Sequence, residues 1–293
     1  CCLLFIPPPA TIALSRPLAA ASLILACSAA GAATVTTPAG VVNGPYSDAP
    51  AFDVWQRVNI AAIASVGITG DYPRSGNGSV LLDSGDVNGR TTWQYSRTGG
   101  FGPLSSFTSA TYEWYRDASS TVAAHFHPTY LIQVDNDGNP ATTGDQSWLF
   151  FERGAMGPYT APTGTLVTET INDSTKMWVF QVGAANTQNP VTTMAQFKAG
   201  AYVPEAGGFA IPATATILRI RVSTGTGWPG TFRGAVDNIG IVAASSVGPD
   251  NFELAPPPPA TVAPVPATDL WALLSLSSLL AGVAAWRQRR RRS

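Results

Sequence analysis

Short runs of alternating apolar and polar residues fill the middle of the chain and constrain its fold most. Leu218, Ile220 and Val222, for example, alternate with Arg219 and Arg221. This period of two is typical of a β-strand that buries one face. Similar runs, rich in Val, Ile, Thr and aromatic residues, are separated by Gly, Pro, Asn and Asp; they are 79–83, 91–95, 110–115, 130–134, 148–152, 176–181 and 235–241. Because no long stretch has a helical period, we predict an all-β sandwich or barrel.

Two segments do not follow this pattern. Residues 61–66 fit either one helical turn or a strand, and the sequence leaves both open. Residues 191–198 could form a short helix. Neither segment changes the predicted fold class.

Residues 1–33 have the layout of a secretory signal peptide. Arg16 precedes a short apolar segment at 18–26, and small residues follow it. Cleavage is expected after Ala30, Ala32 or Ala33. A lipoprotein signal with an acylated Cys27 is the alternative that we favour less.

The C-terminal segment has the features of a membrane anchor. Residues 270–286 carry no charge, and a helix of this length spans roughly 25 Å, close to the thickness of a hydrocarbon core. Trp271 and Trp286 lie at its ends, and five arginines follow within 287–292. The positive-inside rule then places the C-terminus in the cytoplasm and everything before Asp269 outside the inner membrane.

Charge and cysteine content describe the part between these segments. All three cysteines precede residue 34, so the exported part has no disulfide, thiol catalysis or Cys-ligated metal. Residues 34–268 hold 11 of the 17 Lys and Arg residues and 17 of the 18 acids, a charge of about −6. This acidic balance argues against binding to nucleic acid or anionic lipid.

The C-terminal segment resembles the sorting signals of bacterial exosortase systems. The residues similar to the PEP-type motif, with Val265 where the motif has glutamate, are Pro264, Val265, Pro266, Ala267 and Thr268. The spacing from this motif to Trp271 is similar to the related IPTL-type signal. The resemblance implies an exosortase-like transpeptidase as partner, passage through the inner membrane, and delivery to the cell surface or extracellular matrix.

The body resembles jelly-roll domains related to carbohydrate-binding and galactose-binding-like modules. The similar segments are 111–116, 128–132, 148–152, 225–230 and 234–239. The resemblance implies a jelly-roll β-sandwich and a non-catalytic protein that binds, or is embedded in, extracellular polysaccharide. The expected organisation is a signal peptide at 1–33, the β-sandwich at 34–250, a Pro-rich linker with the sorting motif at 251–268, a transmembrane helix at 269–286 and a basic cytoplasmic tail at 287–293.

Two other functions stay open. A carbohydrate-active hydrolase on the same fold would need two carboxyl groups in one groove, for which Glu113 and Glu152 are the candidates. A structural surface domain without a ligand is the other alternative. We expect no enzyme, because the sequence has no Gly-x-Ser-x-Gly elbow, zinc-hydrolase motif or phosphate loop.

One loop gathers hard oxygen donors, which Ca²⁺ binds in sets of six to eight. These donors are Asp135, Asp137, Asn139 and Asp145, and no glutamate closes the loop. Asp, Asn and Gly are also the usual residues of a turn. We therefore predict a hairpin turn and no cofactor, with calcium as the alternative; a calcium held through Asp237 is a weaker one.

Histidine and tryptophan residues supply the other candidates. His125 and His127 would share one face of a strand and could meet one metal, but no third ligand is evident, so chance adjacency is favoured. Trp228 lies between Gly227 and Pro229 in a loop, and we predict that its ring is exposed and binds the ligand. The other tryptophans considered for stacking on sugar rings are Trp93, Trp114, Trp148 and Trp178.

Overall fold

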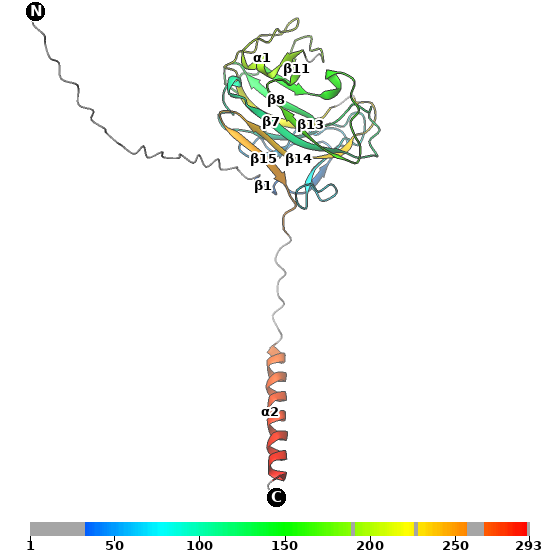
Figure 1. The fold of residues 1–293 in the computed structure, drawn as a ribbon, viewed down its shortest axis with the longest axis vertical. Coiled ribbons are helices and arrows are strands. Elements are labelled where there is room, and N and C mark those ends of the chain that lie inside the picture. The colour runs from blue at the N-terminus through cyan, green and yellow to red at the C-terminus, as the bar shows by residue number, and fades with distance from the viewer. Residues whose placement is uncertain (1–32, 189–190, 226–227, 257–266, 292–293) are drawn as a thin grey trace, which may run out of the picture.

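A computed structural model describes residues 33–188, 191–225, 228–256 and 267–291, and two β-sheets make up its body (Figure 1). The all-β prediction is therefore confirmed. The eight-stranded sheet contains β1 (Thr34–Val35), β2 (Val41–Asn43), β4 (Ser65–Thr69), β5 (Ser79–Asp83), β7 (Ser109–Arg116), β10 (Leu166–Ile171), β14 (Arg233–Val242) and β15 (Ser246–Phe252). The seven-stranded sheet contains β3 (Trp55–Arg57), β6 (Thr91–Ser96), β8 (Thr129–Asp135), β9 (Gln146–Phe151), β11 (Lys176–Gln181), β12 (Thr192–Thr193) and β13 (Thr216–Thr224).

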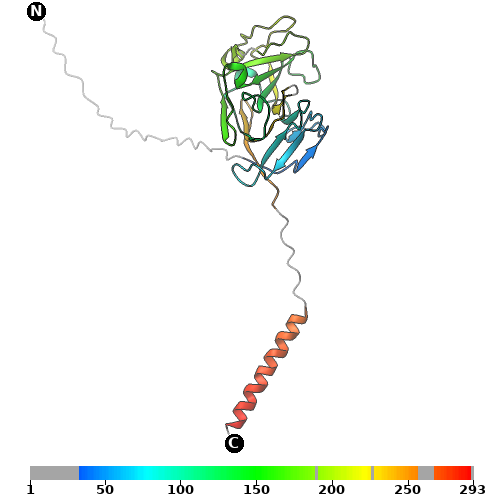
Figure 2. The same ribbon diagram turned by 90° about the vertical axis from the view of Figure 1, so that its right-hand side faces the viewer.

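The order of the strands is that of a jelly roll. In one sheet the central neighbours are β5, β14, β7 and β10. In the other they are β6, β13, β8 and β9. From β5 onward the chain crosses between the sheets after β5, β6, β7, β9, β10 and β13, as in the Greek-key connections of a jelly roll. The N-terminal strands β1 and β2, blue in Figure 2, extend the eight-stranded sheet.

The core lies between the two sheets and is rich in aromatic rings. Trp93 of β6 meets Phe252 of β15 edge to face, with ring centroids 5.5 Å apart. Tyr112 of β7 and Tyr130 of β8 also join the sheets, with ring centroids 5.5 Å apart and an interplanar angle of 41°. All four side chains are fully buried. Each such burial contributes about 1.5–3 kcal/mol relative to an exposed side chain, so these contacts hold the sandwich together.

The alternation predicted for β13 is interrupted by a β-bulge. The register shifts between Ile217 and Arg219, and a bulge adds one residue to a strand and changes which face the next side chain takes. Ile217, Ile220 and Val222 therefore belong to the core, whereas Leu218 borders the outer face beside Arg219. The prediction that Leu218 shares the face of Ile220 is wrong.

Outside the strands, the structure settles the two irregular segments. Part of 61–66 is a strand, because β4 begins at Ser65. The short helix that residues 191–198 could form is α1 (Met194–Lys198), which begins at a capping box formed by Thr193 and Gln196. Two 3-10 turns, η1 (Leu104–Ser106) and η2 (Arg153–Met156), complete the body. The sandwich extends past its predicted end at 250, because β15 continues to Phe252.

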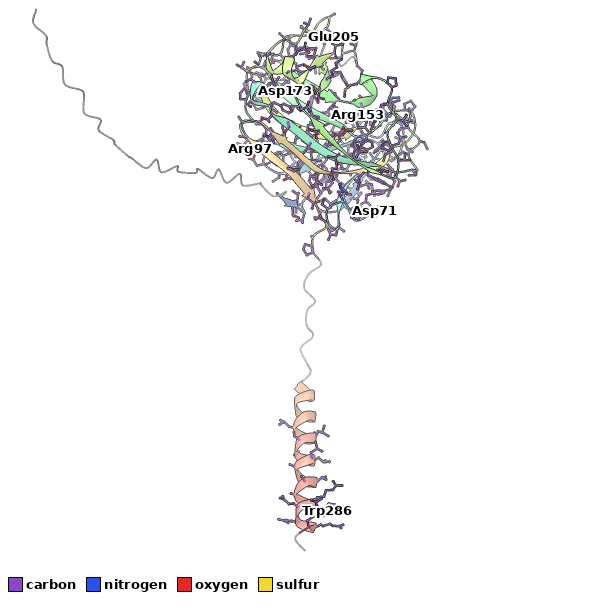
Figure 3. All side chains as sticks on the ribbon, viewed as in Figure 1. Asp71, Arg97, Arg153, Asp173, Glu205 and Trp286 are labelled. Atoms are coloured by element: carbon purple, nitrogen blue, oxygen red, sulfur yellow. The ribbon has the colours of Figure 1, made fainter. Side chains whose placement is uncertain are left out.

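The C-terminal segment contains a second helix, α2 (Ala267–Arg290), which includes the apolar run predicted as a membrane span. Among the described residues, no helix has both the length and the apolar character needed to cross a membrane. The membrane-spanning prediction is thus not confirmed. Trp286 of α2 is 55% exposed (Figure 3).

Several predictions fall on parts of the chain that the structure does not describe. Residues 1–32 of the predicted signal peptide lie outside the described residues, as do Pro264, Val265 and Pro266 of the predicted sorting motif. The signal peptide and the sorting motif therefore stay predictions.

A groove on the outer face of the seven-stranded sheet

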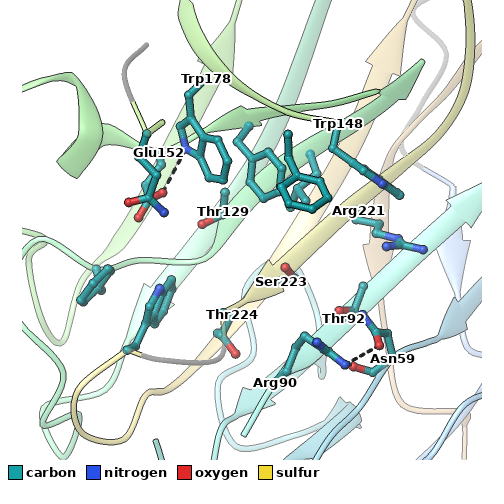
Figure 4. A pocket seen from close by; sticks show the side chains of 17 residues that line it. Asn59, Arg90, Thr92, Thr129, Trp148, Glu152, Trp178, Arg221, Ser223 and Thr224 are labelled. Atoms are coloured by element: carbon teal, nitrogen blue, oxygen red, sulfur yellow. Dashed lines mark hydrogen bonds between the residues drawn. The ribbon is translucent and has the colours of Figure 1, made fainter. Parts of the chain in front are cut away.

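A groove of about 590 Å³ lies on the outer face of the seven-stranded sheet (Figure 4). Its floor carries the hydroxyl groups of Thr92, Thr129 and Ser223, which are cross-strand neighbours on β6, β8 and β13. Alternate side chains of a strand point to the same face, so the residues next to these in sequence enter the core instead. We call this depression the aromatic groove, after the six rings that line it: Phe126, Trp148, Phe150, Trp178, Phe180 and Trp228.

The strand register sorts apolar and polar side chains to opposite halves of the sheet. One row of paired outward residues crosses five strands in the order Trp178, Phe150, Leu131, Arg221 and Gln94. The half formed by β11, β9 and β8 is apolar in this row. The half formed by β13 and β6 is polar and cationic. A ligand lying across the sheet would therefore meet both kinds of surface.

The apolar half is built from rings fixed by stacking. Trp178 stacks on Phe150 with ring centroids 3.8 Å apart and an interplanar angle of 13°. The Trp178 indole N–H donates a hydrogen bond to a Glu152 carboxylate oxygen at 3.2 Å, while burial raises the pKa of Glu152. Phe180, next along this face of β11, is 40% exposed and offers the most accessible ring of the strand.

The cationic half begins at Arg221. Its guanidinium lies over the Trp148 ring, with Cζ 4.1 Å from the ring centroid, and its Nε donates to the Gln94 amide oxygen at 2.5 Å. Burial, followed by repulsion from Arg219 and Arg90, lowers the pKa of Arg221 to about 9. The side chain is therefore still charged at neutral pH.

A loop closes one end of the aromatic groove. Trp228 stacks on Phe126 with ring centroids 4.5 Å apart and an interplanar angle of 18°. The structure places Trp228 at the groove, but its ring is half-buried against the core and not freely exposed as predicted. The segment 122–126, which carries Phe126, is held by Arg116, a buried residue of β7. The Arg116 guanidinium donates hydrogen bonds to the backbone carbonyls of Val122, Ala123, Ala124 and Phe126 at 2.7–3.1 Å.

The remaining tryptophan candidates divide between core and groove. Trp93 and Trp114 are fully buried and therefore cannot stack on a sugar. Trp148 and Trp178 line the aromatic groove. Phe150 and Phe180 were missed as candidates, although alternation places each on the same strand face as the tryptophan two residues before it.

The two histidines do not meet. His127 is fully buried; its Nδ1–H donates to the Pro128 carbonyl at 2.9 Å, and its Nε2 accepts the Arg153 backbone N–H at 3.1 Å. His125 instead packs against Phe126, with ring centroids 4.2 Å apart. Because both nitrogens of His127 are already bonded inside the domain, a metal held by the two histidines does not fit this structure.

The candidate carboxyl pair does not form either. Glu113 is on β7 of the eight-stranded sheet, where it accepts a hydrogen bond from Arg74 at 2.6 Å and another from Asn238 at 2.9 Å. Glu152 follows β9 of the other sheet and lines the aromatic groove. The prediction that these two acids could share one groove is wrong, because they belong to different sheets.

The acidic loop after β8 is a turn whose carboxylates converge. Oxygen atoms of Asp135, Asp137 and Asp145 all lie within 4.8 Å of one another. Asn139 does not add its side chain to them; its backbone N–H donates to Asp135 at 3.0 Å and to Asp137 at 2.7 Å. One Asp145 oxygen is shielded from solvent and has no partner. The arrangement is thus the predicted turn, with three acids placed where a cation would fit.

At the weaker calcium candidate, one Asp237 oxygen accepts the backbone N–H groups of Asn238 and Phe252, at 2.9 and 3.0 Å. This is a structural use of the carboxylate in closing β14 against β15. Its other oxygen is shielded and has no hydrogen-bond partner among the described residues, but the group of three converging acids found in those residues is the one in the acidic loop and does not include Asp237.

Calcium removal distinguishes the two interpretations of the acidic loop. Donors from Asn139, Thr142 and Gln146 already satisfy most of the oxygens, so we expect the loop to keep its shape without metal. Addition of EDTA should shift the thermal midpoint by less than about 1 °C. A drop of several degrees that Ca²⁺ reverses, and that Asp145→Asn abolishes, would establish the calcium alternative.

Comparisons with known proteins give only weak structural similarities. No family model matches the sequence, and no curated protein matches it. The chain is similar in structure to the family 11 carbohydrate-binding module of the cellulosomal cellulase Lic26A-Cel5E of Clostridium thermocellum, with 14% identity over 70% of this chain and 95% of that one and a TM-score of 0.37.

Two further solved structures are similar at the same level. A β-1,2-glucanase from Parabacteroides distasonis matches 62% of this chain and 21% of that one, at 13% identity and a TM-score of 0.33. A structure of carbohydrate-binding modules from the β-sandwich superfamily matches 66% and 56%, at 11% identity and a TM-score of 0.32. Similarities this weak assign no function, and none of them bears on the exosortase resemblance. The class defined here is a jelly-roll domain with an open groove on one sheet.

Proposed function

We propose that this is a non-catalytic protein that binds polysaccharide in the aromatic groove. The observation that carries the proposal is the combination of accessible rings and hydroxyl or amide groups in one depression. A sugar ring has apolar C–H faces that pack against rings such as Phe180 and Trp148. It also has hydroxyl groups that bond to side chains such as Thr129 and Asn59.

The shape of the surface favours a chain over a single sugar. A second depression of about 420 Å³ adjoins the aromatic groove and shares Asn59 and Arg221 with it. A third depression, of about 180 Å³, shares Phe52 and Arg219 with the second. Because each depression shares lining residues with the next, we infer that the three form one track, which would suit an extended ligand.

The acids along this track favour binding over hydrolysis. Glu152 lines the aromatic groove but accepts the Trp178 indole N–H. Asp48 lines the second depression but is paired with Arg57 at 3.3 Å. A glycosidase needs a free acid and a second carboxylate about 5–10 Å apart. Among the described residues that line the three depressions, these two are the only acids, and both are engaged.

We also propose an extracellular location, which rests on the sequence alone. The patterns of residues 1–33 and 264–292 support export, anchoring at the inner membrane and sorting to the cell surface or matrix. A polysaccharide ligand would be met in that compartment.

Removal of a groove ring should weaken polysaccharide binding. We expect Phe180→Ala and Trp148→Ala each to lower the affinity about tenfold, because buried aromatic contacts dominate such interfaces. The measurement is affinity electrophoresis of the full chain through gels that contain neutral or charged polysaccharides.

Tyr115→Ala is the matched control. Tyr115 is on β7 of the eight-stranded sheet, where it packs against Tyr72, so its loss should leave binding unchanged. Equal loss in all three variants would place the ligand elsewhere. Retention of wild-type protein by no polysaccharide would support a structural domain without a ligand.

A further inference from the structure

The cations of this acidic domain are unevenly distributed. Of the 11 Lys and Arg residues between 34 and 268, the five in ion pairs with acids are Arg57, Arg74, Arg153, Lys198 and Arg233. Among those without an acidic partner in the described residues, Arg116 is bonded to backbone carbonyls and Lys176 is exposed at the start of β11. The other four all line the three depressions; they are Arg90, Arg97, Arg219 and Arg221.

Arg219 and Arg221 form the centre of this group. They are two residues apart on β13, so both point to the outer face, and both line the second depression. Arg219 Nε is shielded from solvent and has no hydrogen-bond partner among the described residues. Arg221 is bonded only to the neutral Gln94 and stacked on Trp148. Burial lowers the pKa of both groups, which is the effect of shielding charges without an anion beside them.

The cross-strand neighbours do not compensate these charges. Arg219 is paired with Gln133 on β8 and Ser96 on β6, and Arg221 with Leu131 and Gln94. The amide oxygens of Gln133 and Gln56 are also shielded and without a partner. Unpaired charges and unsatisfied amides in a shielded place are destabilising, so folding alone gives no reason to gather them here. Strongly perturbed groups in a depression are typical of binding surfaces.

We propose that the polysaccharide bound by this protein is anionic and that Arg219 and Arg221 bind its uronic acid carboxylates. This inference rests on the proposed function. The planar guanidinium donates two parallel N–H groups, which match a carboxylate. The neighbouring rings of Trp148 and Phe180 would pack on the sugar faces. Arg90 lines the aromatic groove together with Trp148 and Arg221 (Figure 4), and Arg97 lines the third depression.

The acids near the track leave this pair of arginines free. Asp48 is held by Arg57, and Glu152 by Trp178. The acidic loop reaches the third depression through Gly138 and Pro140, yet neither Arg219 nor Arg221 forms an ion pair with it. The overall charge of about −6 repels any polyanion, uronan and nucleic acid alike, so the attraction proposed here is local to the arginines of the track.

The test compares one polymer in charged and neutral forms. Full-chain protein is titrated by calorimetry with three uronans (polygalacturonate, alginate and hyaluronan), with methyl-esterified polygalacturonate, with a neutral β-glucan and with dextran sulfate. We expect at least one uronan to bind about tenfold more tightly than the neutral polymers, and its affinity to fall as NaCl is added.

The variants assign this preference to the two arginines. Arg219→Gln and Arg221→Gln should each lower uronan affinity about tenfold and should lower the affinity for the neutral polymer by clearly less, because only the charged polymer loses an ion pair. Lys198→Gln is the control, because it changes the net charge equally on α1, where Lys198 pairs with Asp173. Arg219→Gln should keep or raise the thermal midpoint, since it removes an unpaired shielded charge. A marked fall in the midpoint would give Arg219 a structural role and overturn the proposal.

The outcomes separate this inference from the proposed function. If charged and neutral polymers bind with equal affinity, and Phe180→Ala abolishes both interactions, the uronate assignment is overturned while the proposal of polysaccharide binding stands. A second outcome is that dextran sulfate binds more tightly than any uronan and loses this affinity in the same arginine variants. That result would show that the arginines bind sulfate groups, and it would overturn the proposal that they bind carboxylates. No binding to any of the six polymers would contradict both proposals.

Discussion

Replacement of Arg116 by Met should lower the free energy of unfolding by about 3 kcal/mol or more. Arg116 is buried, and its two terminal nitrogens donate to four backbone carbonyls between Val122 and Phe126. A methionine side chain fills a similar space but donates nothing, so buried carbonyls lose their partners. Each unsatisfied buried group costs about 1–3 kcal/mol. The measurement is urea unfolding followed by tryptophan fluorescence.

The same change should affect the groove. Phe126, at the end of the tethered loop, stacks on Trp228, so release of the loop loosens one wall of the aromatic groove. Arg97→Met is the control: Arg97 is a surface residue with one bond to the Ser246 carbonyl, and its loss should cost less than about 1 kcal/mol. Equal stability of the two variants would show that Arg116 does not hold the loop.

His127 should make the domain less stable in acid. Burial lowers its pKa in the folded state to about 4, against about 6.5 in an unfolded chain. Above pH 6.5 the imidazole is neutral in both states, and its contribution is fully present. As the pH falls from 6.5 to 4, the imidazole becomes protonated in the unfolded state while it stays mostly neutral in the folded state. The free energy of unfolding therefore falls by about 3 kcal/mol over this window.

Asp237 acts in the opposite sense, so the effect of His127 must be isolated. Burial raises the pKa of Asp237 to about 6, and this group stabilises the fold as the pH falls toward 4. The comparison is between wild type and His127→Gln at pH 7 and pH 4. Wild type should lose about 3 kcal/mol more than the variant.

A direct titration covers the case in which His127→Gln does not fold. The chain has only two histidines, so NMR of wild type and His125→Gln assigns both imidazole signals. The His127 signal should titrate below pH 5. A His127 pKa near 6.5 would contradict its place in the core.

The strands of the sandwich were largely predictable because each carries its own signal. β5 and β11 were predicted with their observed bounds, since each is a short apolar run between turn residues such as Gly, Asn, Asp and Ser. β1, β2 and β3 have only two or three residues each, too few for a period to be recognised. The bulge in β13 is likewise invisible in the sequence, because it depends on pairing with β8.

The groove was less predictable, because it depends on register between distant strands. Alternation alone places Trp148 with Phe150 and Trp178 with Phe180, yet it does not say that β9 and β11 are neighbours. Nor does it place Arg221 over Trp148, which lies 73 residues earlier in the chain. The loop position of Trp228 predicts an exposed ring. The ring is half-buried because it stacks on Phe126, a contact between residues far apart in sequence that local patterns do not reveal.

The most direct test of the account follows the indole N–H signals of the eight tryptophans while an oligosaccharide is added. Single Trp→Phe variants assign the signals in ¹⁵N-labelled protein. A uronic acid oligosaccharide should shift the signals of Trp148, Trp178 and Trp228, which line the aromatic groove. It should leave those of Trp55, Trp93 and Trp114 in place, because these rings are buried in the core. Shifts confined to other signals, or none with any oligosaccharide tested, would contradict binding in the groove.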